Sequence, residues 1–246
     1  MFSIDVNCDM GEGAGNDEQL MPFTSSASIA CGYHAGDEQT MHQTVDLCLK
    51  YNVAIGAHPS FADKENFGRS EMNLSPEEVY ELVTIQVDSL SKIVKAKGAM
   101  LHHVKPHGAL YNMAAKDLSL AGVIAKAVKD IDPSLILYGL AGSYSITQAI
   151  KTGLKTGSEV FADRTYRDDG SLTPRKEPGA MIDDRNKAVA QVLQMIKDKT
   201  VNGLSGKKIS ILAETICIHG DGQHAVEFAK AIHHQLNEEG IGIKAI

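Results

Sequence analysis

The stretch SIDVNCDMGE at residues 3–12 contains the pattern that decides the fold. A short β-rich run, 3–7, ends abruptly in polar and titratable residues. The same kind of run returns at 28–30, 53–57, 100–104, 135–139, 159–162 and 215–218, and 209–212 is an eighth candidate. Helical patterns separate most of these runs. Strands that alternate with helices of this length predict βαβ units and a parallel sheet.

Helix signals between the runs support this interpretation. The sequence SPEE at 75–78 combines an N-cap, a proline at the first helical position and a capping-box glutamate. Asp117 caps a further helix, and Asp183 or Asp184 starts another. Helical patterns also surround Met41 and cover 222–238. About seven units without a linker favour one closed barrel domain over residues 1–246, with an open doubly wound sheet as the alternative.

Composition narrows the classes of function. The 246 residues include 24 basic and 31 acidic side chains, a net charge of −7 with neutral histidines. An acidic chain with no run of Lys and Arg longer than two disfavours nucleic acid as a partner. No apolar stretch approaches the ~20 residues that span a bilayer, and the first residues lack a signal peptide's basic region. The four cysteines form no CxxC pair, so we expect reduced thiols in a cytoplasmic protein.

Titratable residues gather where the predicted strands end. The carboxyl ends of parallel strands share one rim of a barrel, and active sites form on that rim. We therefore expect side chains that are far apart in the sequence to converge. The candidates are Asn7, Asp9, Glu12, His34, His58, Lys105, His107, Asp163, Arg164, His219 and Asp221, with Arg69 in a nearby loop.

Each candidate also has a purely structural interpretation. Asp9 could cap a turn, and Glu12 in its glycine-rich loop could simply be solvated. The strand-end histidines could be packing residues, as we expect for those at 102–103, and the two arginines could form salt bridges on the rim. Lys105 has the weakest structural explanation, because a lysine is rarely buried without a partner or a task.

Several familiar motifs are missing. The sequence has no GxxxxGK[ST] phosphate cradle, no GxSxG and no HExxH, and its glycines at 11–15 read GxGxG instead of GxGxxG. A dinucleotide site and a Walker-type nucleotide site are therefore disfavoured. No spacing of cysteines and histidines encloses an ion, so the sequence predicts no tightly bound metal. Aspartate and histidine on a barrel rim can nevertheless hold a divalent ion, which leaves metal chemistry as an alternative.

Seven motifs together closely resemble the signatures of the LamB/YcsF family of lactam-utilisation proteins. They occur in the family's order along essentially the whole chain. These motifs are DVNCDMGE (5–12), IACGYHAGD (29–37), GAHPS (56–60), FGR (67–69), VKPHGALY (104–111), FADR (161–164) and IHGD (218–221). The resemblance implies a distorted seven-stranded β/α barrel, related to glycoside hydrolase and deacetylase barrels.

The resemblance also implies an activity. It indicates the A subunit of a bacterial 5-oxoprolinase, which opens the lactam ring of 5-oxo-L-proline (pyroglutamate) to L-glutamate with hydrolysis of ATP. Subunits B and C would be its partners. ATP with Mg²⁺ would be bound with or by those partners, because this sequence contains no recognisable nucleotide cradle.

Physical chemistry suggests roles for the candidates. An amide carbonyl is a poor electrophile, so phosphorylation of the lactam oxygen is a plausible reason for coupling to ATP. Lys105 and Arg164 would hold anionic oxygens, and Asp9, His34 or His107 would activate water. The remaining residues predicted to contact the substrate are Asn7, Glu12, His58, Arg69, His219 and Asp221.

Two other classes of function stay open. The first is a metal-dependent amide or sugar N-deacetylase, with Asp9, His34 and His58 as ligands. The second is a non-catalytic protein that presents the lactam to a partner. The loops 11–24, 61–70 and 165–180 follow rim strands and are candidates for lids or docking segments.

Overall fold

Seven parallel strands form a closed barrel in the computed structural model, which describes residues 2–220 and 225–246. The strands follow chain order from β1 to β6, and β9 pairs with both β6 and β1 to close the barrel. They are β1 (Ser3–Met10), β2 (Ser26–Ala30), β3 (Ala54–His58), β4 (His103–Val104), β5 (Ile136–Leu140), β6 (Lys155–Phe161) and β9 (Thr215–Ile218). A short strand, β10 (Gly242–Ile243), pairs with β1. The prediction of a seven-stranded β/α barrel is confirmed.

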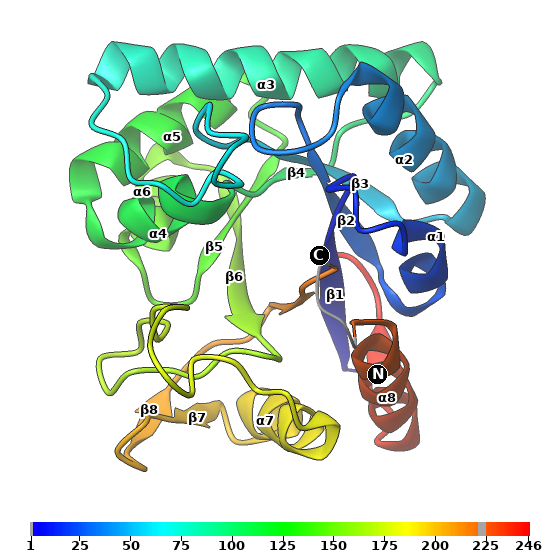
Figure 1. Cartoon of the computed structure of the whole chain (residues 1–246), viewed down its shortest axis with the longest axis vertical. Helices are drawn as coiled ribbons and strands as arrows, with labels where there is room; N and C mark the ends of the chain where they lie inside the picture. Colours follow the sequence, from blue (N-terminus) through cyan, green and yellow to red (C-terminus); the bar gives the residue numbers. More distant parts are fainter. Residues whose placement is uncertain (1, 221–224) are drawn as a thin grey trace.

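Helices surround these strands, as Figure 1 shows. They are α1 (Asp17–Leu20), α2 (Glu38–Tyr51), α3 (Pro76–Ala96), α4 (Gly108–Lys116), α5 (Leu118–Ile131), α6 (Tyr144–Thr152), α7 (Arg185–Lys197) and α8 (Ala225–Glu238), with a 3₁₀ turn η1 (Met21–Phe23). The capping box is present: the Ser75 hydroxyl accepts from the Glu78 N–H, and the Glu78 carboxylate accepts from the Ser75 N–H. Asp117 and Asp184 cap α5 and α7. Within the described residues, none of the helices combines the length and apolar character needed to cross a membrane.

Two segments differ from the sequence-based expectation. The eighth run, 209–212, contributes only to β8 (Lys208–Ser210), which pairs antiparallel with β7 (Thr200–Asn202) in a separate two-stranded sheet. Because β9 already closes the barrel, no place remains there for an eighth strand. The predicted loop 11–24 contains α1 and η1, and Leu20 and Met21 are buried in the core.

The amino end of the barrel interior is filled by a polar network around Asp5. The Asp5 carboxylate accepts hydrogen bonds from the hydroxyls of Ser25, Ser26, Tyr138 and Thr215. The same end holds the buried ring of the second histidine at 102–103, which stacks on the Tyr138 ring with centroids 4.2 Å apart. This end is therefore closed by side chains, as expected for a filled barrel.

Gly108 links the fold to the rim, because it begins α4 directly after His107. Its φ is +58°, and a Cβ added there would lie 2.3 Å from the Gly68 carbonyl oxygen. We expect Gly108→Ala to be destabilising, because the strained φ costs on the order of 1–3 kcal/mol and the overlap costs about as much again. Thermal unfolding is the measurement, with roughly 2–4 °C lost per kcal/mol at this chain length.

Gly13→Ala is the matched control for this glycine. Gly13 also has a positive φ, +86°, but an added Cβ would have no atom within 4 Å. The difference between the two variants therefore isolates the contact with Gly68. Equal melting temperatures for Gly108→Ala and Gly13→Ala would show that this close approach contributes nothing to stability.

Candidate functional site

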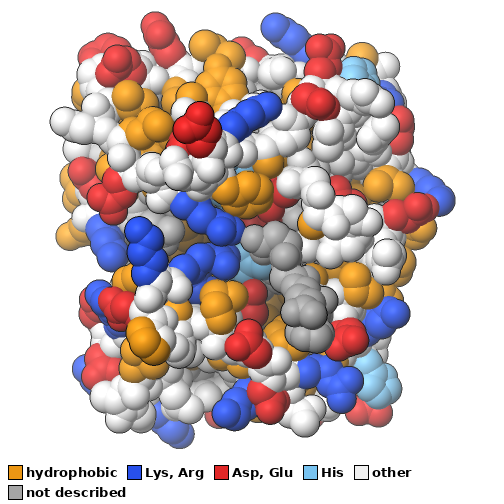
Figure 2. Space-filling view, viewed as in Figure 1, with side chains coloured by type: hydrophobic (Ala, Val, Ile, Leu, Met, Phe, Trp, Pro, Cys, Tyr) orange, Lys and Arg blue, Asp and Glu red, His pale blue; other side chains and the backbone are white. Residues whose placement is uncertain are grey.

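A cavity of about 370 Å³ lies at the carboxyl ends of the barrel strands. Buried Asp9 and Lys105 and the half-buried His219 contribute to its lining. Figure 2 shows Lys and Arg side chains gathered beside a hollow in this face of the molecule. The cations among the described lining residues are Arg69, Lys105, Lys116, Arg164, Arg175 and Lys176. The cavity is therefore suited to a small anionic molecule.

Lys105 lies at the centre of a buried polar cluster and is 2% exposed. Its Nζ donates to Asp9 Oδ1 at 2.7 Å and to Asn7 Oδ1 at 3.0 Å, and it lies 2.7 Å from Glu159 Oε1. The Cys217 sulfur is 3.2 Å away. Burial by itself lowers the pKa of Lys105, but attraction from Asp9, Cys217 and Glu159 outweighs it and raises this pKa well above its usual value. The side chain is thus a fixed positive charge beside Asp9.

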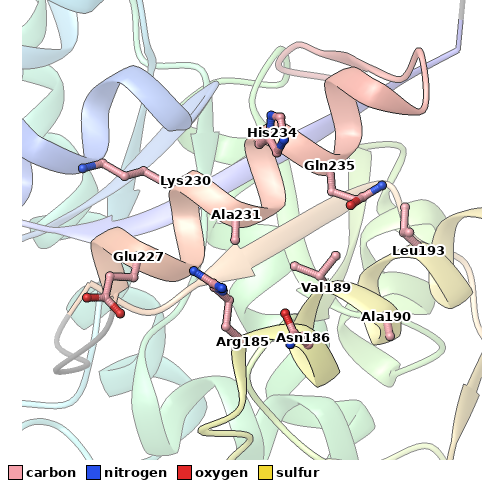
Figure 3. A pocket seen from close by; sticks show the side chains of 10 residues that line it. All are labelled: Arg185, Asn186, Val189, Ala190, Leu193, Glu227, Lys230, Ala231, His234 and Gln235. Carbon is pink, nitrogen blue, oxygen red and sulfur yellow. The ribbon is translucent and has the colours of Figure 1, made fainter.

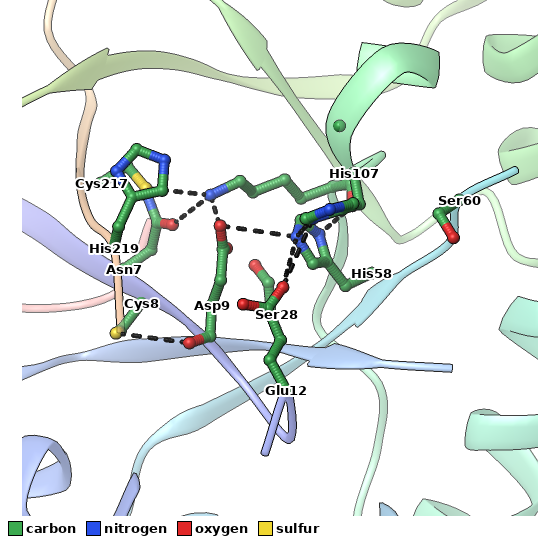
Figure 4. Close-up of polar contacts among 12 residues, drawn as sticks. Asn7, Cys8, Asp9, Glu12, Ser28, His58, Ser60, His107, Cys217 and His219 are labelled. Carbon is green, nitrogen blue, oxygen red and sulfur yellow. Dashed lines mark hydrogen bonds and ion pairs between the residues drawn. The ribbon is translucent and has the colours of Figure 1, made fainter. Parts of the chain in front are cut away.

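A second cluster joins Glu12 to three histidines from successive strand ends, as Figure 4 shows in part. Glu12 Oε1 lies 3.1 Å from His34 Nε2, 3.4 Å from His107 Nδ1 and 3.8 Å from His58 Nε2. The rings of His34 and His107 are stacked with centroids 3.8 Å apart. Burial lowers the pKa of His34 to about 3 and that of His107 well below its usual value, so we expect both rings to be neutral at pH 7.

His219 and Arg164 lie on the side of the cavity formed by β6 and β9. The Asp163 carboxylate accepts from His219 Nδ1 at 2.9 Å, which leaves Nε2 as the remaining ring nitrogen. The Arg164 guanidinium donates to the Thr173 carbonyl. Its Nε is buried and has no hydrogen-bond partner among the described residues. Burial lowers the pKa of Arg164 to about 10, so it stays cationic at pH 7.

The predicted convergence on one rim is confirmed, because strand ends from β1 to β9 meet within hydrogen-bonding distance. Individual positions differ. Asp9, Glu12, His58, Arg69, Lys105, His107, Arg164 and His219 line the cavity. Asn7 and His34 are absent from its described lining, since Asn7 is buried behind Lys105 and His34 is buried behind Glu12. Arg69 packs over the Phe67 ring, 4.8 Å from its centroid. Asp221 lies outside the described residues.

The sequence analysis missed several members of the site. Glu159 is buried beside Lys105, and a carboxylate inside an apolar β run was the available signal. Phe67 has a φ of +55° and holds His107 through its carbonyl oxygen, for which the sequence carries no direct signal. Thr173, Arg175 and Lys176 come from the 165–180 loop, which was predicted only as a lid or docking segment.

A second depression lies away from the strand ends, between α7 and α8 (Figure 3). It has a volume of about 660 Å³ and is lined by Arg185, Asn186, Val189, Ala190, Leu193, Glu227, Lys230, Ala231, His234 and Gln235. These side chains belong to the outer surfaces of two helices. The depression lacks the buried charge pairs of the rim, so we place the candidate site in the barrel cavity.

Comparison with known proteins identifies the family. The model of the LamB/YcsF family matches residues 4–246. The chain belongs to the LamB/YcsF family. Among curated relatives, the A subunit of 5-oxoprolinase from Geobacillus thermodenitrificans is 54% identical over 250 residues, covering 100% of this chain and 98% of the relative. The protein of the same name from Shouchella clausii is 55% identical, covering 100% and 99%.

Solved structures agree with this membership. The lactam utilization protein from Thermus thermophilus superposes on this LamB/YcsF chain with a TM-score of 0.93, at 42% identity and with both chains fully covered. A family 4 carbohydrate esterase from Streptomyces lividans has a TM-score of 0.51 at 12% identity and covers 100% of this chain and 93% of its own. At that identity the esterase shows a shared barrel fold only.

Proposed function

We propose that this LamB/YcsF protein is the A subunit of an ATP-dependent 5-oxoprolinase, which converts 5-oxo-L-proline to L-glutamate. The observation that carries the proposal is the cavity at the strand ends, where a buried Lys105–Asp9 pair lies among further cations. Relatives that are 52–55% identical over nearly their full length bear this name. The four buried cysteine thiols are compatible with a reducing cytoplasm.

The substrate is a small lactam with one carboxylate, and the cavity's cations match it. Arg164 offers a planar guanidinium whose Nε is without a partner among the described residues, which suits a carboxylate or phosphoryl oxygen. Arg175 and Lys176 lie on an exposed loop tip at the same cavity and can hold further anionic oxygens. These contacts would orient the lactam ring with its carbonyl toward Lys105.

Opening the ring requires activated water and a stabilised oxyanion. Lys105 supplies the fixed positive charge for negative charge that develops on the lactam oxygen. Of the predicted bases, Asp9 and His107 line the cavity, whereas His34 does not. His219, oriented by Asp163, is a further candidate that the structure adds. Asn7 acts behind Lys105, through its 3.0 Å contact with Nζ.

ATP with Mg²⁺ would supply the phosphoryl group that activates the lactam carbonyl. The cations of the cavity fit phosphoryl oxygens, but the sequence contains no Walker cradle for a nucleotide. We therefore propose that the nucleotide is bound with or by partner subunits B and C. The relatives are named as one lettered component of an enzyme, which implies a multi-subunit complex.

Reconstitution tests this function directly. The chain is mixed with candidate B and C subunits, 5-oxoproline, Mg²⁺ and ATP, and glutamate and ADP are measured. We expect glutamate formation that needs ATP and all three subunits, with about one ADP for each glutamate. Glutamate formed at the same rate without ATP would favour a metal-dependent amide hydrolase instead. Normal turnover with Lys105 and Asp9 both replaced would favour a non-catalytic, substrate-presenting role.

A further inference from the structure

We propose that Glu12, His34, His58 and His107 form a binding site for one divalent transition-metal ion, with zinc as the best-matched ion. The four residues follow four consecutive barrel strands, β1 to β4, and their donor atoms all lie within 4.8 Å of one another. Sequence spacing predicted no tightly bound metal, because the four ligands are separated by tens of residues. The inference stands on the geometry of the site and does not depend on the proposed 5-oxoprolinase activity.

The hydrogen bonds behind the three histidines determine which ring nitrogens carry hydrogen. His58 Nδ1 lies 2.6 Å from the Lys105 carbonyl oxygen, and a carbonyl can only accept, so Nδ1 is the donor. His107 Nε2 donates in the same way to the Phe67 carbonyl at 2.9 Å. When these rings are neutral, His58 Nε2 and His107 Nδ1 carry only lone pairs.

His34 is oriented by the same logic through a hydroxyl. Ser60 Oγ donates its single hydrogen to the Phe61 carbonyl at 2.9 Å, so it must accept from His34 Nδ1, also at 2.9 Å. The opposite nitrogen, His34 Nε2, is then bare as well. All three bare nitrogens are directed at Glu12 Oε1, and hydrogen-bonded second partners of this kind are typical of metal-ligating histidines.

Bare lone pairs at these distances repel unless a positive species lies among them. His58 Nε2 and His107 Nδ1 are 2.9 Å apart, and His34 Nε2 is 3.1 Å from the Glu12 carboxylate. Two additional protons could relieve the repulsion, and one divalent cation does the same with a single particle. Four ligands at about 2.0–2.2 Å from a tetrahedral ion lie roughly 3.3–3.5 Å apart, and the observed separations of 2.9–3.8 Å bracket that value.

The surroundings support an ion at this point and not at the neighbouring cluster. Asp9, Cys217 and His219 also lie within reach of one another, but the Lys105 ammonium already occupies that position, 2.7 Å from Asp9. In contrast, Phe67 at its strained φ of +55° and Gly68 close over His34 and His107. Three imidazoles and one carboxylate match the ligand preferences of zinc.

Metal content and metal affinity test the proposal on the full chain without a histidine tag. The chain is stripped with a chelator, loaded with Zn²⁺, Co²⁺ or Mn²⁺, dialysed and analysed for bound metal, while titration calorimetry gives the affinity. We expect about one Zn²⁺ per chain and a visible absorption band of four-coordinate Co²⁺. His58→Gln should abolish both. Ser60→Ala, which removes only the partner of His34, should weaken Zn²⁺ binding by roughly 10- to 100-fold.

His234→Gln is the matched control, because His234 is an exposed histidine on α8 that pairs with Glu238. It should leave binding unchanged. Negligible metal after loading with all three ions would overturn the proposal. Stoichiometric metal that survives both His58→Gln and Ser60→Ala would overturn it as well, by placing the ion elsewhere. If His58→Gln does not fold, Ser60→Ala alone decides. No arm contains 5-oxoproline, so failure of this site and failure of the proposed activity are seen separately.

Discussion

Lys105→Ala is expected to lower turnover of the reconstituted complex by about two to three decades, because one charge directed at a developing oxyanion contributes ~3–4 kcal/mol. The structure adds a second effect that the sequence does not indicate. The Lys105 ammonium separates two buried carboxylates, those of Asp9 and Glu159. Removing one partner of a buried ion pair costs about 3–5 kcal/mol. We therefore expect a fall in the melting temperature, although the sequence alone suggested an intact fold.

A pair of variants separates the two effects. Lys105→Met keeps most of the side-chain volume but leaves Asp9 and Glu159 facing each other. The double variant Lys105→Met with Glu159→Gln removes that repulsion, so stability should be partly recovered while turnover stays low. Unchanged turnover in the double variant would return Lys105 to a structural role. Lys105→Arg should also fail, because the four acceptor atoms around Nζ leave no room for a wider guanidinium.

Lys97→Ala is the control for loss of a lysine ion pair at the surface. Lys97 pairs with Asp46 at 2.5 Å, and the Asp46 side chain is 61% exposed. Exposed pairs contribute about 0–1 kcal/mol. We expect turnover to be unchanged and the melting temperature to move by no more than a few degrees. Turnover and thermal unfolding of both alanine variants are measured under the same conditions.

The strand ends could be predicted from sequence because β1 shows the alternation directly. Ile4, Val6 and Cys8 face the surrounding core, and the three polar residues between and after them, Asp5, Asn7 and Asp9, point into the barrel. Successive side chains of a strand point to opposite faces, so this polar series lies on one face. The parallel rule then places the last of them on the rim beside the other strand ends.

The partners of these residues could not be predicted, because they depend on how strands are juxtaposed around the barrel. Glu159 and Phe161 are two residues apart on β6, and both approach the Lys105 ammonium, at 2.7 Å from an oxygen and 5.9 Å from the ring centroid. The sequence shows that they share a face but not which strand lies opposite. The histidine tautomers depend similarly on carbonyl groups that only the folded chain brings near.

The chain without partners is expected to form no glutamate from 5-oxoproline, even with ATP and Mg²⁺ present. The lactam must be activated before water attacks it, and the sequence has no Walker cradle with which this chain could bind the nucleotide alone. The cavity is open where the 165–180 loop approaches it, with Thr173 buried and 174–179 exposed. A partner that covers this opening would also keep bulk water from an activated lactam.

The exposed tip of this loop provides the sharper form of the same prediction. Reversing the charges of Arg175 and Lys176 to glutamate leaves the anchor at Thr173 intact, but places negative charge where phosphoryl oxygens and a partner would approach. We expect the complex to lose most of its turnover, while the melting temperature of the chain is unchanged. The same reversal at Lys207 and Lys208, an exposed pair on the β7–β8 hairpin, is the matched control and should be silent. Glutamate formed by the chain alone at the rate of the complex would refute the partner requirement. Equal turnover of the two reversed variants would remove the loop from the active surface.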